Sequence, residues 1–139
     1  MRPKRRIPIT EHPGLGEAVI EPARLYAGKE RLPRRGVLCF FGDVLGGGVE
    51  AGELERVTAL HGEGDPNPVY VHGSDLSSVE PVIAAFPGLG APLAAATLEE
   101  LIGQGVDRFV CCGGAGVLDG EIPPGQIVVP VAALRDEGT

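Results

Sequence analysis

The sequence is poor in aromatic residues, which make up 4% of its 139 residues and include no Trp. It also has no long apolar run, since none approaches the roughly 18–20 consecutive apolar residues of a membrane-spanning helix. The N-terminus carries charge but no apolar segment behind that charge, so it does not resemble a secretory signal. These absences predict a protein that has no membrane segment and works in the cytoplasm.

Cysteine and histidine are also scarce, with three residues of each. Cys39, Cys111 and Cys112 lie in apolar runs, and an odd number without framework spacing indicates a reducing compartment. No Cys or His spacing matches a zinc site, so we expect no metal. Cys111 and Cys112 are predicted to be small buried core residues on successive strand positions, with a site-lining role for Cys111 as the alternative.

Positive charge is missing from most of the chain. Residues 1–35 contain nine of the twelve Lys and Arg residues and four acids, whereas residues 36–139 contain three basic residues and fifteen acids. We therefore expect a basic, Pro-rich arm over 1–35, with a short helical turn near 18–26, and an acidic folded domain over 36–139. An acidic domain argues against binding to nucleic acid, because phosphate neutralisation dominates that affinity.

Glycine and proline are abundant, at 22 and 13 residues, and they separate short apolar runs. The clearest pattern predicts a helix over 88–105, with Pro92 early, good helix formers after it, Gly105 at its end, and Leu98, Leu101 and Ile102 on one face. A short amphipathic helix is expected over 53–60, after a loop over 43–52. Buried strands are expected over the remaining apolar runs: 36–42, 69–72, 79–86, 106–112 and 126–131.

Apolar strands that alternate with helices predict an α/β layered fold, covered on both faces of its sheet. Three glycine clusters follow three of these strands, at Gly42 with 46–48, at 88–90 and at 113–116. Each cluster alone is explained by a tight turn. Three on one sheet edge could instead converge on an anion, because glycine lets backbone N–H groups approach closely and a helix N-terminus favours negative charge. Neither a dinucleotide fingerprint nor a Walker loop is present.

Four ordered motifs resemble the nucleoside phosphorylase family, in its branch of uridine phosphorylases, hexameric purine nucleoside phosphorylases and nucleosidases. They are the turn Gly88-Leu89-Gly90-Ala91-Pro92 before an Ala-rich helix, the loop 113–116 after a strand, the segment Ile122 to Pro130, and the segment Ala132 to Thr139. The resemblance is firm from about residue 86 onward and loose over 36–85.

This resemblance implies a three-layer α/β/α fold with a mixed central sheet. It implies phosphorolysis of a nucleoside, in which phosphate attacks the ribose and the base leaves, without a cofactor or metal. The expected partners are nucleoside, inorganic phosphate and further copies of the chain in a homo-oligomer. No catalytic residue is assigned. The expected phosphate- and substrate-binding residues are Gly42, Asp43, Gly88, Gly90, Gly113, Gly114 and Arg135, with a capping role as the alternative for Asp43.

Several family positions differ in this chain. Cys111 and Gly114 stand where the family commonly has a phosphate-binding Arg and a hydroxyl residue, and the first loop lacks its usual Pro and Arg. Loss of a guanidinium removes a bidentate phosphate clamp, so hydrolysis by a nucleosidase is one alternative and a non-catalytic nucleoside-binding relic another. The chain is also expected to be the N-terminal part of a phosphorylase domain, from a fragment or a split gene.

Overall fold

A computed structural model describes residues 20–61, 65–72 and 80–133. The part Ile20–Gly114 forms a single compact unit around a five-stranded sheet, and residues 115–133 belong to a second unit. No helix in the described ranges is long and apolar enough to cross a membrane. In chain order the elements are α1 (Pro22–Leu25), β1 (Arg35–Cys39), α2 (Gly42–Glu50), β2 (Leu54–Leu60), β3 (Asn67–His72), β4 (Val82–Ala85), α3 (Ala91–Gly103) and β5 (Arg108–Cys112).

The sheet has the strand order β2-β3-β4-β1-β5. β1 lies between β4 and β5 and is parallel to both, with Leu38 paired to Ala85 on one side and to Cys111 on the other. β3 runs antiparallel to β4 and to β2. The predicted mixed central sheet is therefore confirmed, and the three parallel strands end on one edge of it.

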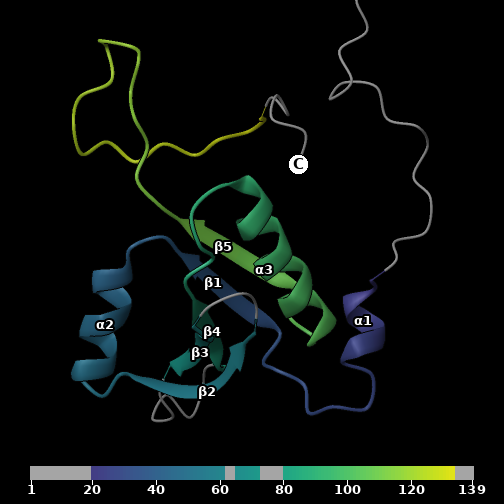
Figure 1. Cartoon of the computed structure of the whole chain (residues 1–139). Coiled ribbons are helices and arrows are strands. Elements are labelled where there is room, and N and C mark those ends of the chain that lie inside the picture. The colour runs from purple at the N-terminus through teal and green to yellow at the C-terminus, as the bar shows by residue number, and fades with distance from the viewer. Residues whose placement is uncertain (1–19, 62–64, 73–79, 134–139) are drawn as a thin grey trace, which may run out of the picture. The chain divides into compact units, whose positions relative to one another are not determined.

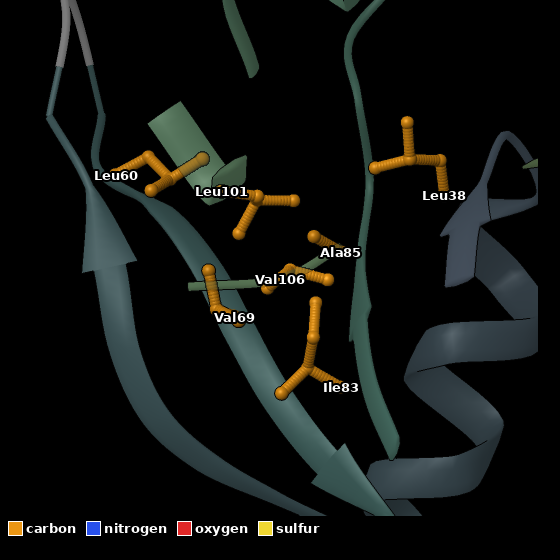
Figure 2. Packing of buried hydrophobic residues seen from close by; sticks show 7 residues of the cluster. All are labelled: Leu38, Leu60, Val69, Ile83, Ala85, Leu101 and Val106. Atoms are coloured by element: carbon orange, nitrogen blue, oxygen red, sulfur yellow. The ribbon is translucent and has the colours of Figure 1, made fainter. Parts of the chain in front are cut away.

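Helices cover both faces of this sheet, as Figure 1 shows for α2 and α3. On the α3 face, a fully buried cluster joins Ile83 and Val69 of the sheet to Leu101 of the helix (Figure 2). On the α2 face, a smaller cluster contains Cys39, Ala84 and Leu45. Side chains alternate between the faces of a strand, so β1 and β4 each contribute to both clusters. Helices on both faces of the sheet give the predicted three layers.

The helix predicted over 88–105 is confirmed as α3, with Pro in its first turn and Gly105 after its C-cap at a φ of 108°. The N–H of Gly105 donates to the carbonyl of Ile102, and that of Val106 to Leu101, so glycine closes the helix in a left-handed conformation. One detail was wrong: Leu101 is buried and Leu98 half-buried, but Ile102 is 52% exposed. The predicted turn near 18–26 is also present as α1.

Two neighbouring predictions were wrong in secondary structure. Residues 43–52, expected as a loop, lie mostly in α2, and residues 53–60, expected as a helix, form β2. β2 pairs with β3 along its length, with a bulge between Arg56 and Thr58. The helix formers of 53–60 are therefore overridden by a strand partner that is close in sequence, because propensity is a weak local preference.

The segment 115–133 contains no helix or strand. A turn forms around Asp119, whose carboxylate accepts a hydrogen bond from the N–H of Glu121 at 3.0 Å. The strand expected over 126–131 is absent, since none of these residues is in a strand, and Ile127 and Val131 are 88% and 98% exposed. An apolar run without a partner for its N–H and C=O groups does not form a ladder, and Pro130 lacks a donor.

Candidate anion-binding edge and adjoining cavity

The carboxyl ends of β4, β1 and β5 lie side by side at one edge of the sheet. Their register places Ala85 beside Leu38, and Cys39 beside Cys112, at the last paired positions. Gly42, Gly88 and Gly113 directly follow these strands, so the glycine that opens each predicted cluster lies at this edge. The prediction was wrong for 46–48, which lie within α2 and not at the edge. In α/β sheets this edge is where ligands bind.

Two helices begin at this edge with uncapped N-termini. The N-cap residues are Phe41 for α2 and Gly90 for α3, and no side chain of the described residues gives either helix a capping hydrogen bond. The first turn of a helix leaves backbone N–H groups without intrahelical partners, and the helix dipole adds partial positive charge there. The edge therefore presents two sets of unpaired donors that suit an anion.

The loop after β5 lies against the turn between β1 and α2. The N–H of Phe40 donates to the carbonyl of Cys112 at 2.8 Å. A Cβ added to Gly113 would stand 3.3 Å from the Cβ of Phe40, and one added to Gly114 would meet only Cε1 of Phe41 at 3.9 Å. Neither glycine has a positive φ. Glycine at position 113 is thus favoured by a close approach, whereas neither backbone conformation nor packing against the described residues explains glycine at position 114.

Glycine at the turn between β4 and α3 has conformational reasons. Gly88 and Gly90 adopt φ values of 81° and 94°, which other residues reach only with strain. A Cβ on Gly88 would also stand 2.2 Å from Cδ2 of Leu93. This turn brings the backbone of 88–91 to the same edge as Gly42 and Gly113.

Charge at this edge is negative or absent. Asp43 lies exposed in the first turn of α2, without a capping bond. Arg135 lies outside the described residues. The described segments at the edge, 39–43, 60–61, 65–67, 86–93 and 112–114, contain no Lys or Arg. The donors available to an anion from these segments are therefore mainly backbone N–H groups.

The opposite edge of the sheet carries the ion pairs. The guanidinium of Arg34, just before β1, donates two hydrogen bonds to Asp107, just before β5, and this lowers the pKa of the Asp107 carboxyl. Arg35 pairs with Glu80 at 2.9 Å. These contacts fix the starts of the parallel strands and leave their ends to the glycine turns.

A cavity of about 580 Å³ adjoins the edge at Gly88, between α3 and the facing ends of β2 and β3. Its apolar wall includes Leu60, Phe86 and Leu93, and its polar groups are His61, Asp65, Asn67, Thr97 and Glu100. The amide nitrogen of Asn67 donates to the carbonyl of Phe86 at 2.6 Å, and the Thr97 hydroxyl donates to the carbonyl of Pro87 at 3.3 Å.

Glu100 is held in the cavity wall from outside. The Tyr26 hydroxyl donates to Oε2 of Glu100 at 2.9 Å. Burial of the phenol, followed by this hydrogen bond and the carboxylate charge, raises the pKa of Tyr26 above its ordinary value of 10.0.

The sequence patterns did not predict any of the polar cavity residues as site residues. These residues come from three segments of the chain, and no local spacing links them. His61 was expected only to be structural or exposed.

The prediction that Cys111 and Cys112 are core residues was wrong. Both are exposed, and only Cys39 among the three thiols is buried. The reason is the strand order: β5 is at the edge of the sheet, so its side chains have neighbours on one side only, and Val110 is likewise 61% exposed. Among the described residues, no group of three or more His, Cys, Asp or Glu side chains is placed to hold a metal ion.

The chain is similar in sequence to several phosphorylases. A guanosine phosphorylase from Halorubrum lacusprofundi is 42% identical over 52 residues, which are 37% of this chain and 22% of that protein. A uridine phosphorylase from Thermococcus kodakarensis is 36% identical over 59 residues, or 42% of this chain and 21% of that protein. A uridine phosphorylase from Treponema pallidum is 34% identical over 73 residues, 52% of this chain and 28% of that protein.

The matched part of the chain thus spans between about a fifth and about three tenths of the length of these relatives. No solved structure matches the chain. The family model described as Phosphorylase superfamily matches residues 35–139, which include the sheet, the glycine turns and the segment beyond them. The resemblance read from the sequence motifs is confirmed, and the chain belongs to the phosphorylase superfamily.

Proposed function

We propose that the protein of which this chain is part cleaves nucleosides by phosphorolysis, with inorganic phosphate bound at the carboxyl edge of β4, β1 and β5. The observation that carries the proposal is the meeting of two uncapped helix N-termini and the 113–114 loop at that edge. A phosphate dianion accepts hydrogen bonds from backbone N–H groups, and preorganised donors hold it with little reorganisation.

Each proposed site residue has its own role at this edge. Gly42 and Gly90 open the two helices, Gly113 lets its loop approach Phe40, and Gly114 leaves space for the anion. Asp43 is negatively charged, so it suits a ribose hydroxyl as hydrogen-bond acceptor better than it suits phosphate. Gly88 fixes the turn before α3, and Arg135 would supply the guanidinium that the described edge lacks.

The likeness to guanosine and uridine phosphorylases supports a nucleoside as substrate. The reaction needs no cofactor: phosphate is the co-substrate, and the protein supplies position and charge stabilisation. We further propose a homo-oligomer in the cytoplasm, without a nucleic-acid or membrane partner.

A hydrolytic nucleosidase is the second candidate, favoured by the absence of Lys and Arg from the described edge segments. A backbone-only cradle lacks the bidentate charge of a guanidinium, and water would then replace phosphate as nucleophile. A non-catalytic nucleoside-binding relic is the third.

One assay separates these candidates. The full-length gene product is incubated with guanosine, adenosine and uridine, with and without phosphate, and free base and ribose 1-phosphate are measured. Base release that requires phosphate supports phosphorolysis. Release of base and free ribose at equal rates without phosphate supports hydrolysis, and nucleoside binding without release supports the relic.

A matched pair of variants locates the anion. Gly114→Ala introduces a methyl group where only Phe41 is in contact, so the fold tolerates it. We expect the KM for phosphate to rise about tenfold or more, since one displaced charge-assisted hydrogen bond has that effect. The control, Gly120→Ala, meets no atom within 4 Å and should leave the KM unchanged. An unchanged KM in Gly114→Ala would place phosphate elsewhere.

A further inference from the structure

Two of the three cysteines lie next to each other at the ends of neighbouring strands. In the register of β1 and β5, Cys39 is paired with Cys112, and Leu38 is paired with Cys111. Directly paired residues place their side chains on the same face of a sheet, and successive residues point to opposite faces. Cys39 belongs to the cluster on the α2 face. Cys112 therefore lies on the α2 face beside Cys39, whereas Cys111 lies on the α3 face beside Leu38.

Among the three thiols, all of which the structure describes, the backbone spacing suits a disulfide only between Cys39 and Cys112. Neighbouring strands are about 4.7–4.9 Å apart, and the Cα atoms of a disulfide are usually about 4.4–6.8 Å apart. The Cα atoms of the consecutive residues Cys111 and Cys112 are only about 3.8 Å apart. A bond from Cys39 to Cys111 would have to pass from one face of the sheet to the other.

The two thiols of this pair differ in their access to solvent. Cys112 is exposed, whereas Cys39 is only 6% exposed. A dissolved disulfide compound can therefore reach the sulfur of Cys112, and Cys39 is reached only by a group that is already beside it. An accessible cysteine with a second cysteine next to it is the usual arrangement of a redox-sensitive pair.

We propose that Cys39 and Cys112 form a dithiol site for oxidised thiol compounds such as glutathione disulfide, which convert the pair into a reversible disulfide. The thiolate of Cys112 attacks one sulfur of glutathione disulfide, the S–S bond breaks, and one glutathione leaves with the proton that Cys112 gave up. The thiolate of Cys39 then attacks the sulfur of Cys112, and the second glutathione leaves with the Cys39 proton. Two protein thiols are thereby oxidised and one glutathione disulfide is reduced, so an added thiol reverses the reaction.

The dithiol site lies beside the anion-binding edge. The N–H of Phe40 donates to the carbonyl of Cys112 at 2.8 Å, and the Cys39 thiol donates to the carbonyl of Phe41 at 3.5 Å. Phe41 is the N-cap residue of α2. A disulfide consumes the S–H donor of Cys39, so it removes this contact with the start of α2. An effect on phosphate rests on the proposed function, whereas formation of the disulfide does not.

Two single substitutions leave the same number of thiols and give a matched comparison. Cys111→Ser keeps two cysteines on one face of the sheet, whereas Cys112→Ser keeps two cysteines on opposite faces. Both variants of the full-length protein are incubated with glutathione disulfide, and tandem mass spectrometry of unreduced peptides measures the internal disulfide. We expect about tenfold or more of it in Cys111→Ser, because only this pair meets the geometry of a disulfide without backbone movement.

Unfolding supplies the control for thiol reactivity. In urea the two variants should form the disulfide to equal extents, because the loops that they close differ by one residue and closure depends weakly on length. Equal extents in the folded proteins would overturn the inference, as would no link in folded Cys111→Ser. If circular dichroism shows that Cys111→Ser does not fold, the wild-type protein gives the test. Its peptides should contain the link from Cys39 to Cys112, and a link to Cys111 in its place would overturn the inference.

Activity measurements on the same samples separate this inference from the proposed function. A protein that forms the link between Cys39 and Cys112 but releases no base even when reduced would support the dithiol site and refute phosphorolysis. A protein that phosphorolyses nucleosides but forms no link would refute the dithiol site alone. In a protein that does both, oxidation should raise the KM for phosphate severalfold, and dithiothreitol should restore it. An unchanged KM would overturn the effect of the pair on the start of α2.

Discussion

The two helices that flank the sheet contrast in how their sequences specify them. α3 contains three consecutive alanines with Leu and Glu residues, and its Leu101 is fully buried. α2 contains four glycines in nine residues, and Leu45 is its only buried residue. Both nevertheless begin at the same sheet edge and end in the same way, with a glycine at positive φ after the C-cap, Gly52 or Gly105. α3 is favoured by its own residues, whereas α2 depends on its surroundings.

The surroundings of α2 are visible at Gly48. A Cβ at this position would stand 2.8 Å from Cδ1 of Leu54, so the missing side chain lets the helix approach β2. Gly46 and Gly47 meet nothing within 4 Å and have no such packing reason. Glycine in α2 therefore allows a tertiary contact at position 48 and weakens the helix at 46 and 47.

Truncation of a core side chain should change the free energy of unfolding most, and should change it more on the α3 face than on the α2 face. Leu101→Ala removes a fully buried side chain from the α3 cluster and should lower the free energy of unfolding by about 2–5 kcal/mol. Leu45→Ala, in the smaller α2 cluster, should lower it less, because more of that site is open to solvent and able to relax. Urea denaturation of both variants measures the difference. An equal loss would mean that α2 contributes as much core as α3.

The start of α3 is the next most sensitive point. Gly88→Ala places a side chain at a φ of 81° and forces Leu93 to move, since its Cδ2 would be 2.2 Å away. Strain at one such residue alone costs about 1–2 kcal/mol, and the clash adds to it. Gly90→Ala is the control, because it shares the positive φ but has its nearest atom, Cδ of Pro92, at 4.0 Å. A smaller loss for Gly88 than for Gly90 in urea denaturation would contradict the steric argument.

Sequence reasoning was accurate where local preference and tertiary structure agree. The parallel strands at 35–39, 82–85 and 108–112 are short apolar runs bounded by glycine or proline, and α3 has propensity, Pro92 and Gly105 in its favour. It failed for α2 and β2, where a glycine-rich stretch is helical and a stretch of helix formers is a strand. Both failures reflect contacts that each segment makes with a neighbouring segment: Leu54 of β2 lies against Gly48 of α2, and β3 pairs with β2.

The candidate site, too, has features that the local sequence predicts and features that depend on tertiary structure. The glycine turns could be placed on one edge because the carboxyl ends of parallel strands must meet there. The exposure of Cys111 and Cys112 could not be predicted, since it depends on β5 being the outermost strand. The cavity could not be predicted either, because Asn67, Thr97 and Glu100 are brought together only by the packing of α3 beside β3 and β4.

A smaller effect tests whether α2 can be made more like α3. Gly46→Ala and Gly47→Ala should each raise the free energy of unfolding by about 0.5–1 kcal/mol, because both positions are helical, exposed and open around the added Cβ. Gly48→Ala should gain less or lose stability, since Leu54 must move. Thermal denaturation of the three variants gives the ranking, and stabilisation by Gly48→Ala equal to the other two would refute the packing role of Gly48.

The smallest expected effect concerns a contact that α3 has and α2 lacks, the hydrogen bond from Tyr26 to Glu100. The pKa of Tyr26 is raised, first by burial of the phenol and then by Glu100, so the neutral phenol is favoured in the folded state. The stability from this group is therefore complete below pH 10, the ordinary pKa of tyrosine, and is lost as the pH rises through the raised folded value.

Alkaline absorbance titration of a Tyr70→Phe background reports Tyr26 alone, because the chain has two tyrosines. In this background Glu100→Ala should bring the Tyr26 pKa part of the way back toward 10.0, since burial remains while the hydrogen bond and the carboxylate charge are removed. Glu99→Ala should leave it in place, and circular dichroism confirms that each variant is folded over the titrated range. A Tyr26 pKa at or below 10.0 with Glu100 intact would show that the phenol does not hold this carboxylate, and the orientation of Glu100 in the cavity wall would then need another cause.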